Sequence, residues 1–99
     1  MNENIEKLIE YPKNGILSKE IVKNDKLNVT LFCMAGGTEI SEHTSTRQGF
    51  VYVIERDGNF SLEGKNIKMA PGIFIYINKN AVHSIKADEN IGFILVLTN

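Results

Sequence analysis

From about residue 15 to the end of the chain, apolar and polar residues alternate or form short apolar runs, with turn residues between them. A period of two is typical of β-strands, and clusters of Gly, Pro, Asn and Asp are typical of turns. The pattern predicts eight or nine short strands with no helix between them, and therefore an all-β sandwich or barrel. The expected strands cover residues 15–23, 26–34, 38–45, 50–55, 59–64, 65–69, 73–77, 82–87 and 91–98.

Only the beginning of the chain has a helical pattern. Ile5, Leu8 and Ile9 recur at a spacing that places them on one face of a helix, and Pro12 prevents its continuation. The sequence predicts a short N-terminal helix over about residues 3–11.

Two of the expected strands, 73–77 and 91–97, are apolar at consecutive positions and would present apolar side chains on both faces. A sheet with one face in water alternates instead. A chain of 99 residues has little material to cover two faces, so the pattern favours a homodimer.

Composition narrows the class of protein. With 42% hydrophobic and 23% charged residues, the chain is typical of one globular domain, here residues 1–99, rather than of a disordered segment. The net charge of −1 and the scattered basic residues argue against nucleic acid as a partner.

No apolar run is long enough for a membrane span or a signal peptide, so we expect no membrane association and a cytoplasmic location. The single cysteine, Cys33, allows no internal disulfide and is expected to be buried.

The chemistry-bearing residues of greatest interest are the two histidines, His43 and His83. On strand 82–87, His83 shares the apolar face with Ile85. On strand 38–45, strict alternation assigns the residues to two faces: Glu39, Ser41, His43 and Ser45 on one, and Thr38, Ile40, Glu42 and Thr44 on the other. Gln48 has the parity of the apolar positions that come after it.

Two imidazoles and one amide from His43, His83 and Gln48 would make a three-donor set for a divalent metal. No carboxylate completes this set, because Glu42 points to the other face and Glu39 lies roughly 13 Å along the strand. A lone histidine on a strand is more often a hydrogen-bonded core or rim residue than a metal ligand. A nucleophile–base arrangement of His43 with the neighbouring serines lacks a strained elbow and a third member.

The stretches "GTEISEHTSTRQGFVYVIERDG" (37–58) and "APGIFIYINKNAVHSIKA" (70–87) carry more information together than either histidine alone. In order and spacing they resemble the two motifs of the cupin superfamily, most closely those of small single-domain bacterial cupins. Gly37, five residues and His43 match the first motif, and Gly72 and His83 match the second at its spacing. Within the second motif, Asn78 and Asn80 occupy the places of a proline and a glycine, and Ala87 occupies the place of the final asparagine. The resemblance covers about residues 26–98.

The resemblance implies a double-stranded β-helix of the jelly-roll type, with the motif residues at its centre around a divalent metal such as Zn, Ni, Fe or Mn. It also implies dimers formed through sheet faces. The sequence departs from the family pattern at the metal ligands, since the second histidine of the first motif falls at Ser45 and the glutamate falls near Gln48 or Gly49. The expected ligands are therefore His43, His83 and Gln48.

Three functions stay open on the sequence alone. The first is a small-molecule-binding cupin with a reduced, weak metal site, in which Ser41, Ser45, Tyr52 and Tyr76 contribute to the ligand pocket. The second is a metal-dependent isomerase or dioxygenase acting on a small carbonyl or phenolic compound. The third is a non-catalytic dimer module without a ligand.

Overall fold

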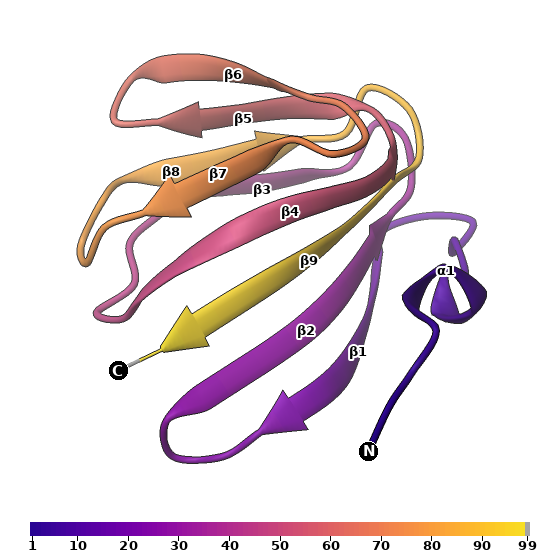
Figure 1. Cartoon of the computed structure of the whole chain (residues 1–99). Helices are drawn as coiled ribbons and strands as arrows, with labels where there is room; N and C mark the ends of the chain where they lie inside the picture. The colour runs from indigo at the N-terminus through magenta and orange to yellow at the C-terminus, as the bar shows by residue number, and fades with distance from the viewer. Residues whose placement is uncertain (99) are drawn as a thin grey trace.

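Nine strands and one turn of helix make up the computed structural model, which describes residues 1–98 (Figure 1). Their bounds are α1 Ile5–Leu8, β1 Ile16–Lys23, β2 Leu27–Met34, β3 Glu39–His43, β4 Gln48–Arg56, β5 Gly58–Leu62, β6 Lys65–Met69, β7 Phe74–Ile77, β8 His83–Lys86 and β9 Ile91–Thr98. The predicted all-β class is confirmed, and the strands fall where the period-two pattern placed them, apart from shifts at their ends.

The strands form two antiparallel sheets that face each other (Figure 1). Sheet A has the order β1-β2-β9-β4-β7, and sheet B has the order β3-β8-β5-β6. Strands that are distant in sequence are therefore neighbours, as in the pairing of β3 with β8 and of β2 with β9. This arrangement brings residues of the two sequence motifs to one place.

The core lies between the sheets, where alternate side chains of each strand point inward. Val51 and Phe93 of sheet A meet Phe60 and Ile85 of sheet B, and all four are buried. At one end of the barrel, the side chains of Met34, Met69, Ala87 and Ile91 have no solvent exposure. We call this the packed end.

The N-terminal helix is shorter than predicted. It spans only Ile5–Leu8, is capped by Asn4, and gives way to extended backbone at Ile9. A single helical turn gains little from its own hydrogen bonds, so contacts with the sheet decide the conformation of the residues after it. No helix within residues 1–98 is both long and apolar enough to cross a membrane.

The segment after the helix is held on the outer face of sheet A by hydrogen bonds. Tyr11 donates a hydrogen bond of 2.6 Å to Glu55, and Lys19 of β1 donates one of 2.8 Å to the carbonyl of Leu8. A Cβ atom at Gly92 would lie 3.2 Å from the Tyr11 hydroxyl, so the absence of a side chain there lets the segment approach β9 closely. The segment covers part of the outer face of sheet A.

Candidate functional site

The two histidines meet at the end of the barrel opposite the packed end. His43, the last residue of β3, is the cross-strand partner of His83, the first residue of β8. Their ring centroids lie 4.1 Å apart, with an angle of 59° between the ring planes. We call this region the histidine end.

A β-bulge turns His43 into the barrel. Ile40 pairs with Ile85 and His43 pairs with His83, so two residues of β3, Ser41 and Glu42, stand opposite one residue of β8. The additional residue reverses the alternation, because a bulge places two residues against one. His43 therefore lies on the inner side with Ile40, and the predicted face shared with Ser41 was wrong.

Each imidazole is held by a backbone carbonyl two residues earlier in the chain. The Nδ1 atom of His43 lies 2.8 Å from the oxygen of Ser41, and that of His83 lies 2.9 Å from the oxygen of Ala81. A carbonyl only accepts, so Nδ1 carries the proton in both rings and Nε2 has a free lone pair when the ring is neutral. Histidines that bind metals are commonly oriented in this way.

The environments of the two rings differ. His83 is 7% exposed and stacks on Phe60, with ring centroids 5.7 Å apart and ring planes 7° apart. Burial lowers the pKa of His83, the hydrogen bond to Ala81 opposes this, and the nearby His43 lowers the pKa further. His83 is therefore neutral at pH 7. His43 differs in its burial, because its side chain is exposed at the rim.

A small hollow of about 60 Å³ lies beside the histidines. Apart from the two imidazoles its walls are apolar side chains from both sheets: Phe32, Ile40, Val51, Phe60, Ile77, Ile85, Phe93 and Leu95. A space of this size holds a few water molecules or a small chemical group.

Sequence comparison identifies the family to which this arrangement belongs. The sequence model of the cupin domain matches residues 30–97, which is most of the chain. The chain belongs to the cupin domain family. No curated protein matches it significantly.

Solved structures agree with the fold of this cupin. A conserved protein of unknown function from Streptococcus pyogenes is 20% identical, with a TM-score of 0.90 over 100% of this chain and 87% of its own. A cupin superfamily protein from Desulfitobacterium hafniense is 18% identical, with a TM-score of 0.88 over 93% of this chain and 84% of its own. At this level of identity the likeness shows the fold, and the double-stranded β-helix implied by the motifs is confirmed.

An enzyme is also among the structural neighbours of this cupin. The salicylate 1,2-dioxygenase from Pseudoaminobacter salicylatoxidans is 16% identical, with a TM-score of 0.79 over 85% of this chain and 26% of its own. The match therefore concerns about a quarter of that enzyme, and again shows the fold alone.

The structure does not bring Gln48 together with the histidines. Val51 lines the hollow, so the residues of opposite parity on β4, including Gln48 and Tyr52, face outward. The Oε1 atom of Gln48 accepts a 2.7 Å hydrogen bond from the Tyr76 hydroxyl on that outer face. Gln48, Tyr52 and Tyr76 thus lie outside the barrel, and the expected contact of Gln48 with the two imidazoles is absent.

The two serines of the expected pocket also lie away from the hollow. Ser41 faces the outer side of sheet B as a result of the bulge. The hydroxyl of Ser45 accepts a hydrogen bond of 3.1 Å from the backbone of Arg47, and its carbonyl accepts one of 2.7 Å from Asn80. Ser45 therefore orders the loop between β3 and β4 and links it to the loop that precedes His83.

Two inward polar residues were missed by the sequence analysis. Thr30 is 9% exposed and shares the inner face of β2 with Phe32, and its hydroxyl donates a 2.8 Å hydrogen bond to Asn28. Thr30 pairs with Leu95, which lines the hollow. The signal was present, because Asn28 and Thr30 interrupt an otherwise apolar strand on the face of Phe32.

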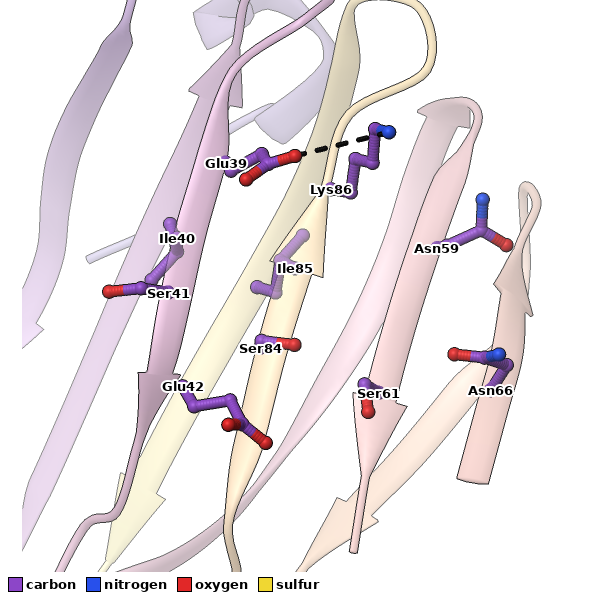
Figure 2. A pocket seen from close by; sticks show the side chains of 10 residues that line it. All are labelled: Glu39, Ile40, Ser41, Glu42, Asn59, Ser61, Asn66, Ser84, Ile85 and Lys86. Carbon is purple, nitrogen blue, oxygen red and sulfur yellow. Dashed lines mark ion pairs between the residues drawn. The ribbon is translucent and has the colours of Figure 1, made fainter. Parts of the chain in front are cut away.

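The outer side of sheet B carries a shallow, open groove of about 790 Å³ (Figure 2). Figure 2 shows its polar side chains, among them Ser61, Asn66 and Ser84 across the strands and the Glu39–Lys86 ion pair at one end. That pair is 3.9 Å long and both partners are 62% exposed, so it contributes little to stability. The groove has the composition of a sheet face in contact with water.

The donor set can be compared with the metal that cupins commonly hold. Within residues 1–98 no three His, Cys, Asp or Glu side chains are grouped as metal ligands. The two Nε2 atoms suit zinc, nickel or iron, whereas manganese prefers oxygen ligands. His43 and His83 would therefore supply two nitrogen ligands to a divalent metal, and the described residues place no third ligand of these types beside them.

Proposed function

We propose that this protein is a small-molecule-binding cupin whose ligand is recognised by His43 and His83, with a weak divalent-metal site at the same place. The observation that carries the proposal is the pair of oriented imidazoles. Both Nδ1 atoms are occupied by backbone carbonyls, so both Nε2 atoms remain as acceptors beside an apolar hollow. A hydrogen-bonded packing role alone would not require two adjacent rings with the same free atom.

The hollow limits the part of the ligand that enters the barrel. Its 60 Å³ is small beside pockets for drug-sized ligands, which measure about 300–1,000 Å³. An engineered apolar cavity that binds benzene measures about 150 Å³. The entering group is therefore compact and apolar, with a hydroxyl or other protic end for the Nε2 atoms, and the rest of the ligand stays at the exposed rim beside His43.

The donor set supports weak rather than tight metal binding. Two neutral imidazoles do not compensate the charge of a divalent cation, and the surrounding walls are apolar. A metal bound there would act as a Lewis acid towards an oxygen of the ligand. The roles of this chain's residues are to orient the two rings, to exclude water through Phe60 and Phe93, and to accept a proton or hydrogen bond at Nε2.

The dioxygenase alternative has less support. The facial triad of iron oxygenases contains a carboxylate beside two histidines. Glu42 and Glu39 line the outer groove of sheet B, on the far side of β3 from the hollow. Likeness to a dioxygenase in fold alone does not replace this ligand.

Metal analysis tests the proposal. Untagged protein purified without chelator is examined by mass spectrometry for metal content and titrated with zinc by calorimetry. We expect weak zinc binding that is lost in the His43→Ala/His83→Ala variant. The matched control is Ser84→Ala, which changes the neighbour of His83 on the outer side of β8 and should retain binding. Zinc binding that survives the double histidine change would contradict the proposal.

Screening of small protic compounds tests the organic ligand directly. Short aliphatic alcohols and primary amides are titrated into the wild type and the same two variants. Binding of one class to the wild type and Ser84→Ala, but not to the double histidine variant, would support the site. Compounds that bind all three proteins equally would place recognition elsewhere.

A further inference from the structure

Sheet A carries polar side chains at the mouth of the barrel, at the same end as the histidines. At this end β2 begins, β9 ends and the loop between β3 and β4 enters β4 (Figure 1). Asn28 of β2 pairs there with Leu97 of β9. Both lie two positions further towards the mouth than Thr30 and Leu95, and therefore share their inward face. Two residues advance a strand by about 7 Å, so Asn28 stands about that far outward of the hollow.

Arg47 reaches the same place from the loop that precedes β4. Its Nη2 atom donates a hydrogen bond of 3.4 Å to the carbonyl oxygen of Leu97, the residue opposite Asn28. Gln48, the next residue, faces outward, so the side chain of Arg47 lies on the inner side where β4 begins. The residue is half-buried. The guanidinium therefore lies at the level of Asn28 in the mouth.

The guanidinium of Arg47 has donors without partners. Within residues 1–98 it forms no ion pair. Its Nε atom is covered by protein atoms and makes no hydrogen bond in the described part of the chain. A guanidinium has five N–H groups, and a buried donor without an acceptor destabilises the arrangement that holds it. The single bond to Leu97 is long, so it restrains the side chain only weakly.

Asn28 provides a second donor at the mouth. Its Oδ1 atom accepts a hydrogen bond of 2.8 Å from the hydroxyl of Thr30, which fixes the orientation of the amide. The Nδ2 atom then keeps its two N–H groups for another acceptor. The mouth therefore presents an oriented amide and a guanidinium, both of which are donors.

We infer that Arg47 and Asn28 bind the carboxylate of a ligand whose hydroxyl end is held by the two histidines. The inference rests on the proposed function and defines the ligand as a small hydroxy acid. A carboxylate accepts two parallel hydrogen bonds from a guanidinium, and this pairing is stronger than a bond between neutral groups. The side chain of Arg47 has to turn towards the mouth to form it, which requires the loss of only the long bond to Leu97.

The number of charges favours a carboxylate over a phosphate. One guanidinium compensates the single charge of a carboxylate, whereas a phosphate monoester carries nearly two charges at pH 7. Asn28 is neutral and adds hydrogen bonds without adding charge. The distance of about 7 Å between the mouth and the wall of the hollow also indicates that several carbon atoms separate the hydroxyl from the carboxylate.

Calorimetric titration with a matched pair of compounds tests the inference. 4-Hydroxybutanoate and butan-1-ol share a hydroxyl and a carbon chain, and only the first has a carboxylate. Both are titrated into wild type, Arg47→Gln, Asn28→Ala and Lys86→Gln. Lys86→Gln removes a positive charge from the outer side of sheet B, so it controls for the change in net charge. Circular dichroism verifies that each variant is folded, and Asn28→Ala provides a second, independent change at the mouth.

We expect wild type and Lys86→Gln to bind 4-hydroxybutanoate about ten-fold more tightly than butan-1-ol. This preference should disappear in Arg47→Gln and decrease in Asn28→Ala. Equal affinities for the two compounds in wild type would overturn the inference, while binding of butan-1-ol that depends on the histidines would leave the proposed function intact. A preference that persists in both folded mouth variants would also overturn the inference. If neither compound binds wild type, the proposed function fails together with the inference.

Discussion

The two ends of the barrel interior are built from the same two sheets but have opposite properties. At the packed end, Met34, Met69 and Ile91 are excluded from solvent completely. At the histidine end, His43 is exposed, Leu95 is only partly buried, and a hollow remains between the sheets. The same strands therefore fill one end with apolar side chains and leave the other incompletely filled.

This difference separates stability from function. A close-packed interior loses several kcal/mol when a large side chain is shortened. A hollow beside polar groups contributes less to stability and provides the space and the atoms for recognition. We expect substitutions at the packed end to lower the free energy of unfolding, and substitutions at the histidine end to change binding.

The largest expected effect is at the packed end. Met69→Ala removes a side chain with no solvent exposure and should lower the free energy of unfolding by about 2–5 kcal/mol. Urea denaturation followed by circular dichroism measures this loss. Zinc affinity of the folded fraction should be unchanged, and a strong loss of affinity would show that the two ends are not separable.

An intermediate effect is expected where the two ends meet. Phe60 belongs to the core and also stacks on His83. Phe60→Leu should lower the free energy of unfolding by about 1–2 kcal/mol and weaken zinc binding roughly ten-fold, because the ring that orients His83 is lost. Denaturation and calorimetry on the same sample give both values. Unchanged zinc affinity would mean that Phe60 does not orient the imidazole.

The pH dependence of stability sharpens the contrast between the two histidines. Burial lowers the pKa of His83 in the folded state below its ordinary value of 6.5, so the unfolded chain binds this proton more readily. The contribution of His83 to the free energy of unfolding is therefore fully present above about pH 6.5. It declines as the pH falls through 6.5 towards the pKa of the folded state, and then levels off. Unfolding in chelator from about pH 8 to about pH 5 should show this decline in wild type and a smaller one in His83→Gln.

His43→Gln provides the control for that experiment, because it leaves the buried His83 in place. It should retain most of the wild-type pH dependence. A decline that disappears in His43→Gln but persists in His83→Gln would reverse the assignment.

The smallest expected effect tests the bulge in β3. Ser41 faces the outer groove, whereas strict alternation would place it beside His43. Ser41→Ala should change the free energy of unfolding by less than about 0.5 kcal/mol and leave zinc binding unaltered. A clear loss of zinc binding would indicate that the residue faces the histidines and that the bulge is absent.

Much of the fold could be predicted from the sequence because a period of two is a direct consequence of strand geometry. The strands, the all-β class and the meeting of the two motifs result from that pattern and from the family resemblance. The helix at residues 3–11 was predicted too long, because side-chain periodicity does not include the contacts of Ile9 and Tyr11 with the sheet.

The site was predicted less well for two physical reasons. A single additional residue at Ser41–Glu42 reverses the alternation of β3 from that point onward, so that His43 lies on the face of Ile40. No residue type marks such a bulge in the sequence. For Gln48, parity identified the correct neighbours, but both faces of β4 are apolar and the pattern could not tell which one is inside. The meeting of His43 and His83 could be predicted only from the order of the two motifs, because local patterns do not show which strands become neighbours.

The most direct test of the central claim is the protonation of the two imidazoles, which nitrogen-15 NMR can monitor because the chain has only two histidines. With the protein in its neutral-histidine form, both rings should carry the proton on Nδ1 and a bare Nε2. Addition of zinc should shift the Nε2 signals of both rings. A proton on Nε2 of either ring, or a zinc shift confined to Nδ1, would contradict the account of the histidine end as a binding site.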